Sequence, residues 1–236
     1  FERRQNSMWD RKELKAKGKA AFQRNYWKCV IVALILTALI GGGAASGRGS
    51  AQNATPEETA LAEELQKAPR EVLVALMGAM AGVSRIGAAV KLLVFNPLQV
   101  GCKHFFVVNS DNPAELSELK RGFQSNYGRV VVGMFLRDLF IGLGMVLFIV
   151  PGVILAYSYR MAPYILAESP DVDGMEALRR SKQMMNGHKW NTFLLDLSFF
   201  GWYFLAAATL GAVNALWTGP YTEATGAELY KTLKNA

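Results

Sequence analysis

The sequence has very little cysteine or histidine, with two residues of each among 236. Cys29 and Cys102 both fall near the expected cytoplasmic face, where disulfides rarely form. Cys102, His104 and His188 supply at most three ligands and lack a recognised zinc spacing. We therefore expect no disulfide, no metal centre and no cofactor, with the histidines at the surface or at a membrane interface.

Signatures of nucleic-acid binding are absent as well, because no helix-turn-helix or RNA-binding motif occurs. The net charge of +7 comes from basic clusters beside apolar runs, a pattern that favours contact with anionic lipid headgroups. Gly142-x-Gly144 is not a dinucleotide-binding loop, since it lies in an apolar segment with no preceding strand. A membrane protein remains as the class that fits.

The longest apolar run covers residues 129–167 and is interrupted at Pro151-Gly152. Each arm has about the 20 residues that a helix needs to cross the hydrocarbon core of a bilayer. The run therefore predicts two membrane-spanning helices joined by a tight turn at Pro151-Gly152.

Further spans are expected at residues 26–45 and 72–95, and the apolar stretch 191–225 is interpreted as a third hairpin or a single long span. The loop 46–71 is acidic. Because lysine and arginine accumulate in cytoplasmic loops, we expect this loop outside and the N-terminus inside. The first apolar run loosely resembles a signal peptide, but its length and the spans that follow argue against one.

Basic amphipathic helices are expected on the cytoplasmic side at residues 1–25, 109–126 and 171–190. Together with the spans they predict an all-α, polytopic integral membrane bundle that forms a single domain over residues 1–236. Six membrane segments, or alternatively five, are expected, depending on how the last apolar stretch folds.

The first amphipathic helix has a recognisable start. Ser7 and Asp10 have the spacing of a capping box, which predicts that the helix begins at Met8. Trp9, Leu14 and Phe22 could anchor it on the membrane surface while lysines meet anionic lipid. A solvated basic tail that only sets the topology is the alternative.

An internal repeat favours six membrane segments in three hairpins over five segments, in which the last apolar stretch would be a single span. Similar short motifs precede the first, third and fifth spans, namely Phe22-Gln-Arg-Asn-Tyr26, Phe123-Gln-Ser-Asn-Tyr127 and Met185-Asn-Gly-His-Lys-Trp190. The return arms share prolines at Asn96-Pro97, Ala162-Pro163 and Gly219-Pro220. We therefore expect three pseudo-repeated units, with the third hairpin turning near Thr209-Leu210-Gly211.

Several longer motifs are similar to those of the bacterial membrane family called domain of unknown function 975. They are MWDRKELKAKGKAAFQRNYW, PGVILAYSYRMAPYILAESPD, ALRRSKQMMNGHKWNTFLLDLSFFGW and the ending PYTEATGAELYKTL. More distantly, the layout resembles the membrane domain of some glycerophosphodiester phosphodiesterases. The resemblance implies a multi-pass protein of the bacterial plasma membrane and carries over no catalytic residues.

Charged residues inside the apolar segments are the candidate site, because a charge at that depth is costly and needs a partner or a function. Counted from the expected cytoplasmic ends, they fall in one polar layer in the inner half of the membrane. The layer comprises Arg85, Lys91, Arg137, Asp138, Arg160 and Asp196. In one interpretation these charges only hold the bundle together, with Arg137 or Arg160 paired to Asp196 and Asp138 paired to Arg85. In the other, the surplus arginines bind a phosphate or carboxylate, such as a lipid headgroup.

The sequence therefore favours a non-enzymatic membrane protein that binds or moves an amphipathic anion such as a phospholipid, or adapts the envelope to membrane-active compounds. A transporter or channel subunit with a polar path in the inner half of the membrane is the alternative, and an intramembrane lipid hydrolase is a third class. Anionic membrane lipids are the expected partners, nucleic acid is not, and a homo-oligomer is compatible with the sequence.

Overall fold

A computed structural model describes residues 9–45, 87–124, 127–169, 171–209 and 211–235 of the chain, and the side chains of residues 40–45 are not described. Every regular element in these ranges is a helix. In chain order the elements are α1 (Arg11–Arg24), α2 (Tyr26–Ala45), η1 (Lys91–Phe95), α5 (Asn96–Asp111), η2 (Leu116–Phe123), α6 (Tyr127–Leu147), α7 (Ile149–Ser158), α8 (Ala162–Glu168), α9 (Gly174–Met184), α10 (Lys189–Leu197), α11 (Phe200–Ala208), η3 (Asn214–Thr218) and α12 (Gly219–Lys234). The all-α fold class expected from the sequence is confirmed for these residues.

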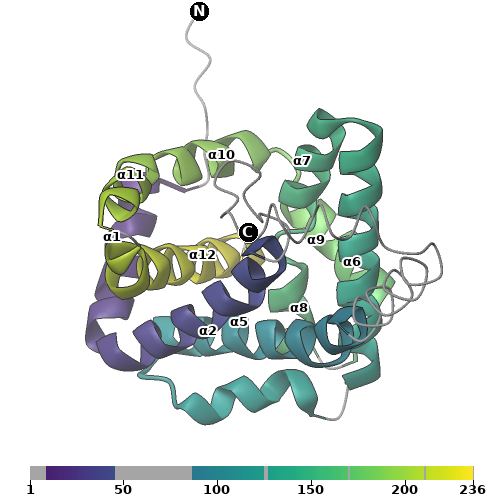
Figure 1. The fold of residues 1–236 in the computed structure, drawn as a ribbon, viewed down its shortest axis with the longest axis horizontal. Coiled ribbons are helices and arrows are strands. Elements are labelled where there is room, and N and C mark those ends of the chain that lie inside the picture. Colours follow the sequence, from purple (N-terminus) through teal and green to yellow (C-terminus); the bar gives the residue numbers. More distant parts are fainter. Residues whose placement is uncertain (1–8, 46–86, 125–126, 170, 210, 236) are drawn as a thin grey trace, which may run out of the picture.

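The C-terminal helix α12 occupies the middle of the bundle, with α10 and α11 along one side and α2 and α5 along the other (Figure 1). Its packing partners include α1, α2 and α5. Most of its residues from Pro220 to Leu233 are buried. The helix is therefore part of the protein core.

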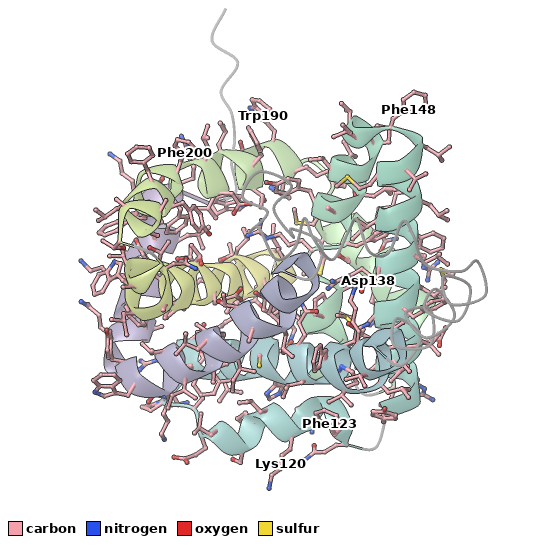
Figure 2. The ribbon with its side chains drawn as sticks, viewed as in Figure 1. Lys120, Phe123, Asp138, Phe148, Trp190 and Phe200 are labelled. Atoms are coloured by element: carbon pink, nitrogen blue, oxygen red, sulfur yellow. The ribbon has the colours of Figure 1, made fainter. Side chains whose placement is uncertain are left out.

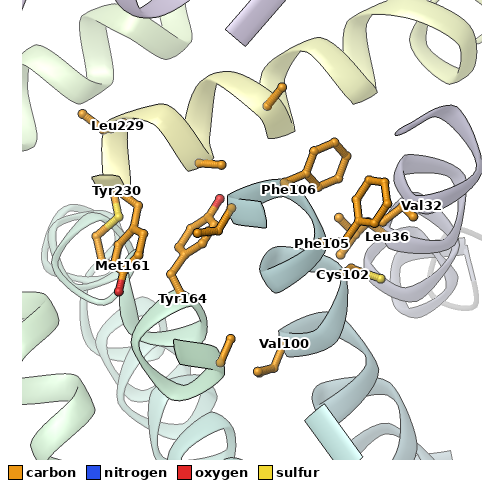
Figure 3. Close-up of a cluster of buried hydrophobic side chains, with 14 of the residues drawn as sticks. Val32, Leu36, Val100, Cys102, Phe105, Phe106, Met161, Tyr164, Leu229 and Tyr230 are labelled. Atoms are coloured by element: carbon orange, nitrogen blue, oxygen red, sulfur yellow. The ribbon is translucent and has the colours of Figure 1, made fainter. Parts of the chain in front are cut away.

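Aromatic side chains from α5, α8 and α12 meet in this core (Figure 3). Tyr164 and Tyr230 stack with their ring centroids 5.0 Å apart, and Phe105 and Phe106 pack edge to face at 5.4 Å. All four side chains are buried. Burying a large aromatic side chain contributes roughly 1.5–3 kcal/mol, so this cluster contributes strongly to the stability of the bundle.

The first amphipathic helix differs from expectation in its start and in its surroundings. Helix α1 begins at Arg11, because Asp10 is the N-cap and accepts a hydrogen bond from the backbone of Lys12. The residues expected on the membrane surface are buried in the protein core, namely Trp9, Leu14 and Phe22. The membrane-surface anchor and the solvated tail are therefore both wrong, since the helix packs on α12, while its role in setting the topology stays a prediction.

The second amphipathic helix is also displaced. Residues 109–111 complete α5, and the chain then passes Pro113 before the 3₁₀-helix η2 begins at Leu116. The expected helix 109–126 is therefore wrong at its start, while Asn126 lies outside the described residues. The third amphipathic helix is present as α9, which follows its N-cap residue Asp173.

The long apolar hairpin is present, but its turn is not at Pro151-Gly152. The chain reverses at Phe148, whose backbone is extended between α6 and α7. Pro151 lies in the first turn of α7, where its missing N–H is not needed for the helix. Gly152 packs against α6, because a Cβ there would lie 2.6 Å from the Met145 side chain. Pro151 is thus compatible with the first turn of the return helix, and Gly152 lets that helix lie close to α6.

Two described helices are long and apolar enough to cross a bilayer, Tyr127–Leu147 and Ile149–Glu168. The helix expected at residues 26–45 has the predicted bounds, and its stretch Tyr26–Leu39 is apolar. The expected span 72–95 lies outside the described residues up to position 86. The structure thus establishes fewer membrane segments than the six, or five, that the sequence predicts.

The last apolar stretch is broken into shorter pieces. Helices α10 and α11 have nine residues each, or roughly 13 Å apiece against the ~30 Å of a bilayer core. The chain then turns at Gly211, whose φ of 87° is easily reached only by glycine, and returns through η3 into α12. A reversal at the expected place is therefore present.

Candidate functional site

Lys91, Arg137 and Asp138 come together where η1 packs on α6. Two nitrogens of Arg137, Nε and Nη2, lie 3.1 and 2.9 Å from Oδ1 of Asp138. Nζ of Lys91 lies 3.5 Å from Oδ2 of the same carboxylate, which is longer than an ordinary hydrogen bond. Two cations therefore share a single carboxylate, and the group keeps a net positive charge.

A groove of about 350 Å³ opens beside this charged group. Its walls are mostly apolar, and its lining residues are Ala88, Ala89, Lys91, Leu92, Asn96, Phe135, Asp138 and Leu139. Lys91 has 61% of its side chain exposed, whereas Asn96 is buried. The groove thus combines an accessible ammonium with an apolar surface. Figure 2 shows where Asp138 lies in the fold.

A local hydrogen bond holds the two walls of the groove together. The hydroxyl of Tyr127, at the start of α6, donates to the backbone carbonyl of Leu93 in η1 at 2.6 Å. Segment η1 is a π-helical turn, a form that frequently occurs at functional sites. Its wider turn precedes the proline-initiated helix α5, and it presents Lys91 to α6.

Arg160 and Asp196 form a second group between α7 and α10. The guanidinium of Arg160 contacts both carboxylate oxygens of Asp196, with Nη2 to Oδ1 at 2.9 Å. The hydroxyl of Tyr157 donates to Oδ2 of Asp196 at 2.9 Å. Such two-point pairing satisfies both partners. This pair, one of those expected from the sequence, joins the membrane hairpin to α10.

The residues of the predicted polar layer therefore separate into two groups, Lys91 with Arg137 and Asp138, and Arg160 with Asp196. No ion pair between described residues joins the two groups. Arg137 pairs with its neighbour Asp138 and not with Asp196. Arg85, the sixth predicted residue, lies outside the described residues.

Sequence reasoning missed a third polar group in the core. Nζ of Lys103 on α5 donates to Oε2 of Glu223 on α12, and both side chains are largely buried. Burial alone would lower the pKa of Lys103, but the carboxylate of Glu223 raises it above the ordinary value, so the lysine stays charged. No signal in the sequence marks this pair, because the two residues are far apart in the chain and neither interrupts a membrane-length apolar run.

The histidines and cysteines form no metal site among the residues that the structure describes. Cys29 and Cys102 are both free and buried. His104 is less exposed than expected, since only 14% of its side chain is accessible. Burial lowers the pKa of His104, although Glu118, 3.2 Å from its Nδ1, acts in the opposite direction. His104 is accordingly neutral near pH 7.

Residues 124–236 match the model of a family described as "Protein of unknown function (DUF975)". That region is similar to this family. The resemblance drawn from the sequence motifs is thereby confirmed, whereas the likeness to glycerophosphodiester phosphodiesterases finds no support in these matches. A UPF0259 membrane protein of Sodalis glossinidius (strain morsitans) is 29% identical over 202 residues, which cover 80% of this chain and 77% of the relative. No solved structure matches the chain. The relative and the two apolar helices support a membrane protein, and the family that residues 124–236 match has no assigned function.

Proposed function

We propose that this protein is a non-enzymatic protein of the bacterial plasma membrane that binds an anionic amphiphile, such as a phospholipid, in the groove between η1 and α6. The observation that carries the proposal is the pairing of two cations, Lys91 and Arg137, with one carboxylate at an apolar groove. An anionic headgroup would balance the remaining positive charge.

The geometry divides the binding between the two cations. Arg137 is largely buried and is committed to Asp138, so it holds that carboxylate in place and offsets its charge. Lys91 is accessible and makes only a long contact, which leaves its ammonium group able to bind a phosphate oxygen. Phe135 and Leu139 line the same groove and would contact the acyl chains.

The Arg160–Asp196 pair supports a structural role instead. Both carboxylate oxygens of Asp196 are occupied, and Tyr157 adds a further hydrogen bond. An anion at Arg160 would have to displace Asp196. We therefore assign anion binding to the groove at Lys91 alone, with anionic membrane lipid as the partner.

The test is native mass spectrometry of the detergent-purified protein titrated with phosphatidylglycerol or phosphatidylcholine. Lys91→Gln should weaken phosphatidylglycerol binding about fivefold, because one basic residue near a membrane surface contributes ~1 kcal/mol to binding anionic lipid. Binding of zwitterionic phosphatidylcholine should change little. Ala89→Phe, which places a bulky side chain in the groove, should weaken binding without changing the charge.

Lys182→Gln is the matched control, since Lys182 is an exposed lysine on α9, away from the groove. Equal losses in Lys91→Gln and Lys182→Gln would mean that lipid binds through overall charge only. Unchanged phosphatidylglycerol binding in both groove variants would rule out the proposed site.

A further inference from the structure

The groove has a counterpart elsewhere in the bundle, which the sequence repeat locates. Aligning Tyr26 with Tyr127, and Pro97 with Pro220, places Leu216 opposite Leu93. The structure repeats the corresponding contact, because the hydroxyl of Tyr26 donates to the carbonyl of Leu216 at 3.1 Å, as that of Tyr127 does to Leu93. Segment η3 thus packs on α2 as η1 packs on α6.

The helix types repeat too. Both η1 and η3 are π-helical turns, and each leads directly into a helix with proline in its first turn, α5 or α12. The second unit in chain order follows the pattern in part, since Pro163 lies in the first turn of α8. Alignment on the prolines places Tyr157 opposite Lys91, and Tyr157 contacts an aspartate of the next unit.

At the interface of η3 with α2 the structure has a pocket of about 240 Å³. In the aligned units Asn214 takes the place of Lys91, and Thr37 takes the place of Asp138. Both residues line the pocket, together with Thr222 and Glu223. The second pocket therefore lies where the repeat predicts, but it has neutral groups in place of the ion pair.

The polar groups of this pocket are suited to a ligand that donates hydrogen bonds. The hydroxyls of Thr37 and Thr222 each donate to a carbonyl of their own helix, which leaves lone pairs on their oxygens as acceptors, although Thr222 also interacts with Tyr203 in the pocket lining. Glu223 accepts from Lys103 through Oε2. The amide of Asn214 adds both a donor and an acceptor.

The charges in this pocket are already paired, which disfavours a strongly ionic ligand. Glu223 is neutralised by Lys103, so neither an anion nor a cation would find an uncompensated partner in the pocket. Ala33 and Leu36 form an apolar wall, and the same two segments, α2 and η3, also carry the exposed residues Leu34 and Leu216. An uncharged, hydroxylated group on an apolar tail meets all of these conditions.

We propose that the pocket between α2 and η3 is a second amphiphile site, specific for an uncharged polyhydroxy headgroup such as that of a glycolipid. Hydroxyl groups of the ligand donate to Thr37, Thr222 and Glu223 and accept from Asn214, while the tail lies along α2. The site does not depend on anion binding at Lys91.

The test measures binding of monoglucosyl diacylglycerol by native mass spectrometry in lauryldimethylamine oxide, a detergent without a sugar. Thr37→Val and Thr222→Val keep the side-chain volume and remove one hydroxyl each, and Asn214→Leu removes the amide. The double variant Thr37→Val/Asn214→Leu should bind the glycolipid about tenfold more weakly, as expected for the loss of two neutral hydrogen bonds. Thr222→Val alone should give a smaller loss and is the variant to use if the double variant does not fold.

Thr232→Val is the matched control, because the Thr232 hydroxyl bonds its own helix away from the pocket. Lys91→Gln should bind the glycolipid normally, which separates this site from the anion groove. Methyl glucoside binding that is also lost in the double variant would support the pocket as a site for the free sugar. Wild-type protein that binds neither probe, or glycolipid binding lost in Lys91→Gln but retained in the double variant, would overturn the proposal.

Discussion

The side-chain amide of Asn25 donates to Oδ1 of the fully buried Asn109 at 2.8 Å. Asn109 in turn donates to the carbonyl of Ala21 at 2.9 Å and accepts from the backbone of Ala114 at 3.2 Å. One side chain therefore fastens the junction of α1 and α2 to the end of α5.

Replacing Asn109 should destabilise the protein strongly. Asn109→Leu removes these bonds and leaves buried polar groups unpaired, which costs ~1–3 kcal/mol for each group. We expect the free energy of unfolding to fall by roughly 2–4 kcal/mol, as measured by thermal unfolding in detergent. Ser110→Ala is the control, because the Ser110 hydroxyl bonds only to its own helix, and a similar loss in both variants would contradict this role.

The Arg160–Asp196 pair should contribute to stability and not to lipid binding. A double-mutant cycle of Arg160→Gln and Asp196→Asn should give a coupling on the order of 1 kcal/mol, as for partly exposed pairs with good geometry. An Arg160→Lys variant should retain little of this coupling energy with Asp196, because lysine cannot make the two-point contact. If Arg160→Gln loses bound phosphatidylglycerol at unchanged stability, the pair is a binding site after all.

Stability should fall at alkaline pH. The pKa of Lys103 is raised from 10.5 because Glu223 outweighs burial, and burial and Glu168 raise the pKa of Tyr230 from 10.0. The folded chain therefore keeps protons that the unfolded chain loses, so this stability is present below about pH 10 and is lost as the pH rises further. Tyr230→Phe should flatten the dependence of the melting temperature on pH above about pH 10.

The tip of the α6–α7 hairpin should contact lipid. Val150 and Phe148 are exposed, and Figure 2 shows Phe148, Trp190 and Phe200 along one edge of the molecule, with Lys120 at the opposite edge. A spin label at Val150→Cys, with both native cysteines replaced by alanine, should be relaxed by oxygen, which concentrates in lipid. A label at Lys120→Cys should be relaxed by a water-soluble nickel chelate, and equal nickel access at the two positions would contradict the expectation.

Sequence patterns located the local features of this fold well. The start of α2 at Tyr26 and the reversal near Gly211 follow from apolar run length and from motifs that recur in the three units. The hairpin turn was misplaced because proline and glycine usually mark turns, whereas Pro151 lies in the first turn of α7 and Gly152 allows close packing on α6.

Contacts between distant segments could not be predicted in the same way. Amphipathic character shows that α1 buries one face, but it does not distinguish a lipid surface from α12 as the partner. Lys103 and Glu223 lie on ordinary polar positions of their helices, and only the packing of α5 on α12 makes them a buried pair. Arg160 with Asp196 was predictable because both interrupt apolar runs, where a charge needs a partner.

The central place of α12 has a consequence for biosynthesis. Among the described helices, the one that fills the core, Gly219–Lys234, is synthesised last, and its partner α1 is synthesised first. During translation the apolar face of α1, with Leu14 and Phe22, therefore lacks its main packing partner until α12 has left the ribosome. Closure of the core is thus a late event, in which the two ends of the described chain meet.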